Sequence, residues 1–396
     1  MTIDLRIAGG PAIQQGYIVI SDDPAAIDID AYGLDVIPGL VDIHGDAFER
    51  ALAPRPGVMM PLAIAMAEFE AQLLACGITT AFLAVTLSWE AGLRSRTTYE
   101  ALRDYVLARP AGSVPDLKLH IRFEAHNLAC LELAEADITA GRIAMLSFND
   151  HTPGIVRKLP DPAATAKYAD RAGRSVAAFT TDAEAAFAAA PDAIIAGRLR
   201  LAAAARAAGI PMASHDDVTI ADRNYFNSLG VHICEFPVRT DVAQASRAQN
   251  SAVVMGAPNV VRGGSHMGWH GAEALVKEGL CDVLCSDYHY PSMLHAAYRI
   301  ALRQTASFAD AINLVTHNPA QAARLTDRGT LAAGNRADVI LIDPGSAGHP
   351  PRPVITIANG KLAYLAPDAM ERVRINATSR TPASARQPSF TMTASA

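Results

Sequence analysis

Short apolar runs rich in β-branched residues alternate with longer, alanine-rich stretches between about residues 36 and 320. A run of this length is typical of a strand that is buried on both faces. Eight such runs occur, at residues 36–43, 79–87, 117–124, 143–148, 211–214, 231–236, 252–256 and 281–286. Helix candidates between them include residues 61–76, 130–140 and 181–208. Eight buried strands that alternate with helices predict an α/β fold, a closed (β/α)₈ TIM barrel.

The two ends of the chain carry weaker strand patterns outside this alternation. Residues 1–35 and 328–375 look like short strands and turns, most clearly at 338–343 and 354–360. We expect them to pair into a small β-sandwich domain built from both termini, with the barrel occupying 36–327. Residues 376–396 are rich in Ser, Thr, Pro and Ala, a composition that predicts a flexible tail.

Composition limits the classes of function. Half of the 396 residues are apolar and mean hydropathy is +0.14, enough for a large core. No apolar run reaches the roughly 20 residues that span a bilayer, and no secretory signal opens the chain. The net charge of −6 argues against nucleic acid or membrane partners. Five cysteines in mostly apolar runs indicate buried thiols, so we expect a cytoplasmic protein, and a homo-oligomer stays open.

Imidazole and carboxylate groups gather at the predicted strand ends, where barrel enzymes carry their chemistry. These are His44 and Asp46, Glu124, Asn149-Asp150-His151, His215-Asp216-Asp217, Glu235 and Asp287. Residues two apart on a strand point the same way, so His44 and Asp46 can reach one ion. Buried charges must be paired or bound to metal, and this mixture suits Zn²⁺, Mn²⁺ or Fe²⁺ better than Ca²⁺ or Mg²⁺. The sequence therefore predicts a divalent metal site holding one or two ions, most simply zinc.

Two of these segments have plainer alternatives. Along residues 117–124, His120, Arg122 and Glu124 alternate with apolar residues and so share one face, which would also suit a solvated edge strand. The regular alternation of strands and helices disfavours an edge. Ser214 to Asp217 could instead be a helix N-cap followed by a first-turn acid.

The strand-end residues resemble the amidohydrolase superfamily. Its pattern combines a small β domain from both termini, a Pro-Gly-Leu-Val-Asp-x-His strand, a fifth-strand His and an eighth-strand Asp. Here the matching residues are Pro38 to His44, His215, Asp287 and Gly334-Asn335-Arg336-Ala337-Asp338. Three positions depart from the pattern. Asp46 replaces the second His of the His-x-His pair, Glu124 on the third strand would be the bridging acid, and Glu235 stands where a sixth-strand His is usual.

A narrower resemblance is to the α-D-ribose 1-methylphosphonate 5-triphosphate diphosphatase family of the carbon–phosphorus lyase pathway. It rests on residues 44–50, 54–58, 88–95, 214–217, 235–237, 257–266 and 286–288. The resemblance implies hydrolysis of the triphosphate between its α and β phosphorus atoms, with release of pyrophosphate. Implied metal ligands are His44, Asp46, Glu124, His215 and Asp287, with Asp287 also the general base. Arg55, Arg94, Arg262, His266 and Glu235 are the expected substrate-binding residues, with a metal-binding role left open for Glu235 and His266.

Two other functions fit the same scaffold. A C–N hydrolase, such as a deaminase, cyclic amidase or deacylase, would use the same metal and Asp287 but needs no cluster of arginines for phosphate. A catalytically silent amidohydrolase-like scaffold would not need His44, His215 and Asp287 together. Release of pyrophosphate from a ribose triphosphate separates the first alternative from the diphosphatase.

Overall fold

The computed structural model describes residues 17–19, 27–264, 271–332, 334–346 and 348–375. The expected tail at 376–396 and the candidate His266 lie outside the described residues. Eight parallel strands form one sheet in chain order, which confirms the predicted barrel. They are β4 (Leu40–Gly45), β5 (Ile78–Leu87), β6 (Asp116–Glu124), β7 (Met145–Asn149), β8 (Met212–His215), β9 (Ile233–Glu235), β10 (Ala252–Gly256) and β11 (Val283–Cys285).

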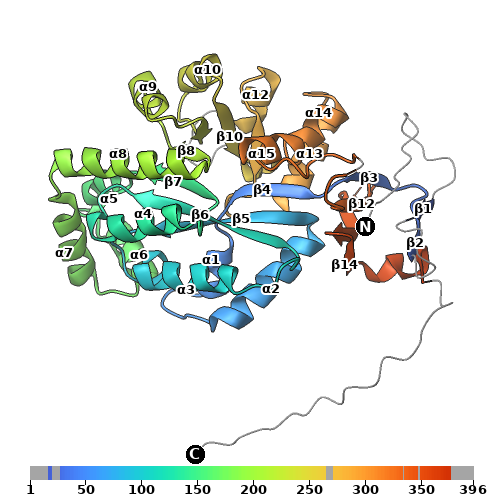
Figure 1. The fold of residues 1–396 in the computed structure, drawn as a ribbon, viewed down its shortest axis with the longest axis horizontal. Coiled ribbons are helices and arrows are strands. Elements are labelled where there is room, and N and C mark those ends of the chain that lie inside the picture. The colour runs from blue at the N-terminus through green and yellow to red at the C-terminus, as the bar shows by residue number, and fades with distance from the viewer. Residues whose placement is uncertain (1–16, 20–26, 265–270, 333, 347, 376–396) are drawn as a thin grey trace, which may run out of the picture.

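Helices follow the strands and surround the barrel (Figure 1). The α-helices are α1 (Phe48–Leu52), α2 (Leu62–Ala75), α3 (Arg96–Leu107), α4 (Leu131–Thr139), α5 (Thr152–Lys158), α6 (Pro162–Ala172), α7 (Val176–Phe187), α8 (Pro191–Ala208), α9 (Ile220–Ser228), α10 (Thr240–Ala248), α11 (Ala257–Arg262), α12 (Ala272–Lys277), α13 (Ser292–Leu302), α14 (Phe308–Asn313) and α15 (His317–Ala322). Short 3₁₀ turns are η1 (Gly92–Arg94), η2 (Leu128–Cys130) and η3 (Pro367–Arg372).

The first apolar run, expected as one strand over 36–43, divides at Gly39 into strands of two different sheets. β3 (Asp35–Pro38) joins a small sheet, and β4 begins the barrel. A side chain at position 39 would collide with the side chain of Thr79, so only glycine fits where the chain crosses. The expected helix over 181–208 also divides, because Pro191 cannot continue a helix and begins α8 instead.

Strands from both ends of the chain pair beside the barrel, at the right of Figure 1. One sheet has the order β1 (Tyr17–Val19), β2 (Ile27–Asp30) and β15 (Val373–Ile375). The other has the order β14 (Lys361–Leu365), β13 (Arg352–Ala358), β12 (Val339–Asp343) and β3. Ile29 of the first sheet and Leu341 of the second belong to one apolar cluster, so the two sheets share a core.

Apolar side chains fill the barrel interior and leave the polar chemistry to one end. Val41, Phe82, Met145 and Val254 pack inside it, together with Ala320 from α15. Polar side chains gather above these apolar residues, at the carboxyl ends of the strands.

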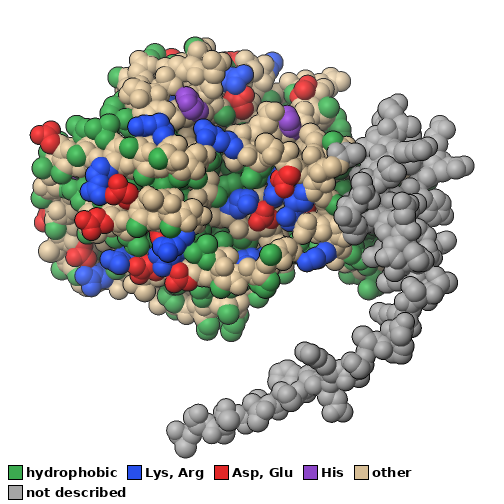
Figure 2. Space-filling view, in the orientation of Figure 1, with side chains coloured by type: hydrophobic (Ala, Val, Ile, Leu, Met, Phe, Trp, Pro, Cys, Tyr) green, Lys and Arg blue, Asp and Glu red, His purple; other side chains and the backbone are tan. Residues whose placement is uncertain are grey.

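No described helix is long and apolar enough to cross a membrane. On the face shown in Figure 2, basic and acidic side chains lie interspersed rather than gathered by sign. That face therefore offers no extended basic surface of the kind that nucleic acids bind.

Candidate active site at the barrel mouth

His44 and Glu235, at the ends of β4 and β9, form a buried group with His120 from the middle of β6. The Nδ1 atom of His44 lies 2.8 Å from Oε1 of Glu235, and Nε2 of His120 lies 4.0 Å from the same oxygen. Ser147 donates to the second carboxylate oxygen, Oε2, at 2.9 Å. Glu235 was expected to bind substrate, but its side chain is 0 % exposed and both oxygens are used inside the barrel. It is placed to hold a metal or a metal ligand.

A second group comprises His151, His215 and Asp216, from β8 and the start of α5. Oδ2 of Asp216 lies 3.1 Å from Nδ1 of His215 and 3.8 Å from Nε2 of His151. The aromatic ring of Phe236 joins the two groups, with its centroid 5.0 Å from that of His44 and 5.2 Å from that of His215. The two sets of potential ligands therefore share one mouth.

Three residues that follow barrel strands adopt the left-handed backbone conformation without being glycine. They are Asp216, Phe236 and Asp287, with φ of 59°, 55° and 52°. Such backbone costs of order 1 kcal/mol and clusters at functional sites. The strain at these three strand ends sets the directions of side chains that line the mouth.

Asp287 occupies the point where the barrel closes. Its amide donates to the carbonyl of His44, and its carbonyl accepts from the amide of Asp46, both at 2.9 Å. Burial and the neighbouring Asp46 raise the pKa of Asp287 to about 8. Burial and Glu49 likewise raise the pKa of Asp46 to about 6. Without a bound cation the carboxyl of Asp287 therefore holds its proton into the neutral range.

Arg122 lies among these groups with only 5 % of its side chain exposed. Its guanidinium donates to Oδ2 of Asp46 at 3.2 Å and to Nε2 of His215 at 3.1 Å. The alternative of a solvated edge strand is wrong for β6, because His120, Arg122 and Glu124 are all buried and β6 pairs with β5 on one side and β7 on the other. The sequence did not assign Arg122 a role in the site.

Glu124 contacts the start of α5. Its oxygens accept from the amides of His151 and Thr152 at 3.1 Å and from the Thr152 hydroxyl at 2.7 Å. Burial would raise the pKa of Glu124, but the bonds from His151 and Thr152 outweigh it and lower the pKa to about 2. Glu124 thus places His151 in the mouth, and its role as a metal ligand stays a prediction.

These side chains fit a divalent cation. The potential ligand atoms of His44, His120 and Glu235 lie within 4.8 Å of one another, as do those of His151, His215 and Asp216. Burial lowers the pKa of His120 to about 3 and that of His215 to about 4, so both rings are neutral, the form that binds metal. Nε2 of His120 is buried without a hydrogen bond among the described residues, whereas Nδ1 of His215 lies beside the carboxylate of Asp216. Neutral, buried imidazoles beside carboxylates, with one ring nitrogen left without a partner, are what a metal site requires.

The expected arginines occupy different surroundings. Arg94 is largely buried, with Nε 3.6 Å from Glu49 and one terminal nitrogen 3.9 Å from Glu90. Arg262 is exposed at the end of α11 and donates to the Tyr288 hydroxyl at 3.2 Å. Arg55 is exposed in a turn that pairs with Val58. Their part in substrate binding stays a prediction.

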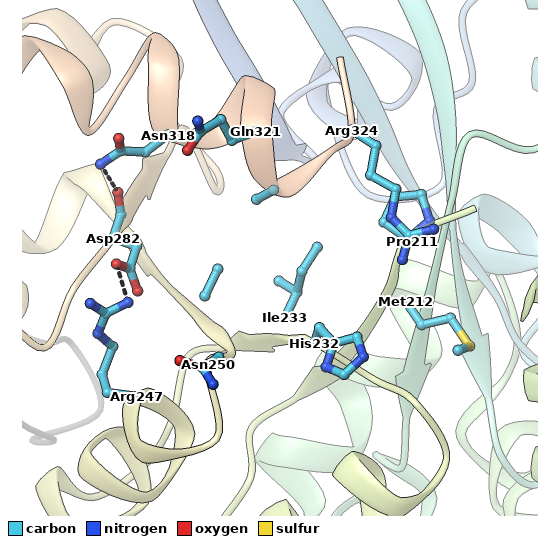
Figure 3. Close-up of a pocket in the computed structure, with 12 residues that line it drawn as sticks. Pro211, Met212, His232, Ile233, Arg247, Asn250, Asp282, Asn318, Gln321 and Arg324 are labelled. Carbon is cyan, nitrogen blue, oxygen red and sulfur yellow. Dashed lines mark hydrogen bonds and ion pairs between the residues drawn. The ribbon is translucent and has the colours of Figure 1, made fainter. Parts of the chain in front are cut away.

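Two hollows mark the two ends of the barrel. One of about 290 Å³ opens beside His151 and Asp216 and is also lined by Asp150, Asp222 and Phe226. The other, of about 380 Å³, lies at the strand starts, with a floor that includes Ile233 and a rim that includes His232, Arg247 and Arg324. Figure 3 shows Arg247 held by Asp282 on one side of this second hollow and Arg324 across it.

Two contributors to the mouth, His120 and Arg122, were not predicted as site residues, and His151 and Asp216 were named at strand ends without being assigned as ligands. Each carried a signal, because the first two lie on the polar face of 117–124 and the others follow strands directly. What the pattern lacked was the pairing of distant strand ends, which brings His120 to Glu235 and His151 to Asp216.

A curated relative decides the family. The chain is 36 % identical over 318 residues to the alpha-D-ribose 1-methylphosphonate 5-triphosphate diphosphatase of Escherichia coli strain K12, covering 79 % of this chain and 84 % of the relative. The chain belongs to this family. The sequence model described as Amidohydrolase family matches residues 267–364, in agreement with the superfamily. The chain is accordingly an enzyme of a metal-dependent hydrolase superfamily.

Solved structures agree on the fold. A 5-methylcytosine deaminase from Klebsiella pneumoniae superposes with a TM-score of 0.55 at 16 % identity, covering 98 % of this chain and all of the deaminase. A prolidase complexed with N-methylphosphonate-L-proline gives a TM-score of 0.53 at 14 % identity over 88 % of this chain and 93 % of the prolidase. Likeness at this level of identity concerns the barrel and not the substrate.

Proposed function

We propose that this enzyme hydrolyses the α–β phosphoanhydride of α-D-ribose 1-methylphosphonate 5-triphosphate and releases pyrophosphate. The observation that carries the proposal is the identity of 36 % to the diphosphatase over most of both chains. The geometry of the mouth supports the reaction class, since it combines imidazoles and carboxylates for a cation with a buried arginine for an anion.

The chain's own residues have distinct parts in this reaction. A divalent ion, zinc by preference and manganese or iron as alternatives, would be held by His44, His120 and Glu235, by His151, His215 and Asp216, or by both groups. Such an ion lowers the pKa of a bound water from about 16 toward 7. The expected ligands Asp46, Glu124 and Asp287 lie outside both groups but next to them.

Asp287 is proposed to accept the proton of the attacking water. Its carboxyl follows the last barrel strand, and its backbone is fixed by hydrogen bonds to residues on either side of Gly45. A general base is most useful when its pKa is near the working pH, and burial beside Asp46 raises the pKa of Asp287 in that direction. The strained φ of 52° fixes the direction of the side chain.

The acid-lined hollow is the proposed place for the sugar. Carboxylates of Asp150, Asp216 and Asp222 can accept hydrogen bonds from ribose hydroxyls, and Phe226 offers an apolar wall. The triphosphate would then lie toward Arg94 and Arg122. Acidic walls would repel phosphate, so this orientation keeps the two ends of the substrate apart.

The deciding experiment supplies purified enzyme, loaded separately with Zn²⁺, Mn²⁺ or Fe²⁺, with the ribose triphosphate and measures inorganic pyrophosphate. Pyrophosphate and a ribose 5-phosphate product in equal amounts are expected. Release of orthophosphate alone, or no turnover with any of the three metals, would overturn the proposal for the substrate.

A further inference from the structure

The buried guanidinium of Arg122 is hydrogen-bonded to groups that a bound metal ion would also use. A guanidinium stays charged in proteins, and a buried charge is stable only while it is paired and hydrogen-bonded. Its two acceptors are the carboxylate of Asp46 and Nε2 of His215, at 3.2 and 3.1 Å. Both acceptors belong to residues expected to hold the metal, and the third nitrogen, Nε, has no hydrogen-bond partner among the described residues.

The position of Arg122 is central within the mouth. Its charge works to lower the pKa values of residues from several elements, namely His44, Asp46, His120, His151, His215 and Asp287. A divalent cation in the same mouth would repel this guanidinium and compete for its acceptors. Arg122 lies two residues before the end of β6 with 5 % of its side chain exposed, so a guanidinium displaced from Asp46 and His215 would need another anion nearby.

We propose that Arg122 binds the phosphoanhydride of the substrate, exchanging Asp46 and His215 for phosphate oxygens once the metal site is filled. The planar fork of a guanidinium matches two phosphate oxygens, and such charge-assisted bonds are among the strongest in proteins. In the metal-free enzyme the same side chain neutralises the empty ligand set. This inference rests on the proposed function, because it takes the substrate to be a phosphoanhydride.

The test compares Arg122→Met and Arg122→Lys with wild type in two binding measurements. Inorganic pyrophosphate is titrated into the metal-loaded proteins, and Zn²⁺ into the metal-free proteins against a competing chelator. Arg122→Met should weaken pyrophosphate binding by about 10- to 150-fold, the loss of a charge-assisted contact. It should raise zinc affinity roughly three- to tenfold, because a competing cation is gone. Arg122→Lys keeps the charge without the fork and should recover part of the pyrophosphate affinity.

Arg328→Met is the matched control, because Arg328 is also buried and donates to Asp116 at the opposite end of β6. It should lower thermal stability and leave both affinities within about twofold. A purely structural role for Arg122 would reduce zinc and pyrophosphate binding together in Arg122→Met. That result, or unchanged pyrophosphate affinity, would overturn the inference, whereas weaker pyrophosphate binding with zinc affinity retained or raised supports it.

The same samples separate this inference from the proposed function. Wild type that binds pyrophosphate through Arg122 yet releases none from the ribose triphosphate would overturn the substrate and leave the role of Arg122 in place. Wild type that turns over normally beside unaffected Arg122 variants would overturn only the role of Arg122.

Discussion

The two ends of the barrel treat buried and partly buried charge in opposite ways. At the strand starts, Arg328 donates to Asp116 and to the Thr80 hydroxyl, and Arg247 is paired with Asp282. At the mouth, Nε2 of His120 is buried without a hydrogen bond among the described residues, and the carboxyls of Asp46 and Asp287 have raised pKa values. Three residues that follow barrel strands there carry left-handed backbone. The paired charges at the strand starts stabilise the fold, whereas the polar groups at the strand ends are suited to binding a metal ion and substrate.

Asp287 gives the largest expected effect among substitutions that test the difference between the two barrel ends. We expect Asp287→Asn to keep fold and bound metal but to lower kcat by more than the roughly 10²–10⁴-fold of a lost general base, because orientation of the water is lost too. An amide preserves much of the shape but cannot take a proton at neutral pH. Steady-state kinetics and metal analysis measure both. Asp116→Asn at the other end should keep kcat within about threefold, and activity of Asp287→Asn within tenfold of wild type would refute the role.

Arg262 sharpens the choice of substrate. Arg262→Ala should reduce kcat/KM on the ribose triphosphate by roughly 10- to 150-fold, since one charge-assisted contact is worth about 1.5–3 kcal/mol. A neutral cyclic amide should be almost unaffected by the same change. Measuring both substrates with wild type and variant distinguishes a diphosphatase from a C–N hydrolase. Equal losses on both substrates would argue that Arg262 acts on the fold and not on phosphate.

The metal-free enzyme should lose stability as pH rises. The folded pKa of Asp287, about 8, lies above the roughly 3.9 of an unfolded aspartate. A raised pKa contributes stability that is present below the unfolded value and is lost as pH rises through the folded value. The melting temperature of the metal-free protein should therefore fall between about pH 4 and pH 8 and level off above that range. Asp287→Asn should flatten this fall, and an equally steep decline in that variant would assign it to other groups.

The smallest effect is expected in the hollow of Figure 3. Arg247 is 43 % exposed where it pairs with Asp282, and exposed ion pairs contribute about 0–1 kcal/mol. Arg247→Ala should therefore shift the melting temperature by no more than about 4 °C and leave kcat/KM within about twofold. A large loss of turnover would break the division between a stabilising end and a reacting end.

The fold could be predicted because strand burial is a local pattern. Eight apolar runs separated by helices predicted a barrel. Because barrel enzymes carry their chemistry at the carboxyl ends of the strands, His44, His215 and Asp287 could be placed at its mouth. Two boundaries escaped the pattern for steric reasons. At Gly39, within the mainly apolar segment 36–43, the chain crosses from the small sheet to the barrel. Pro191 divides an alanine-rich stretch whose composition favours one helix throughout.

The partners of the site residues could not be predicted in the same way. The sequence around Glu235 does not indicate whether its side chain contacts substrate or His44. The contact with His44 depends on a strand nearly 200 positions earlier in the chain. Glu124 gains its contacts only when β7 places the start of α5 beside it. Arg122 was placed on the correct face, yet nothing local indicated which groups would meet it there.

The proposed catalytic residue Asp287 also takes part in the contact that closes the barrel between its first and last strands. Toward the strand starts, Leu314 and Val315 lie between the first and last strands and accept hydrogen bonds from Leu284 and Val41. At the mouth, the direct bridge is between Gly45 and Asp287. This seam is the natural place for the cylinder to open, and a ligand shared by His44 and Asp287 would fasten it from both sides. Loss of that ligand should then appear as faster hydrogen exchange along the seam before the rest of the barrel loosens.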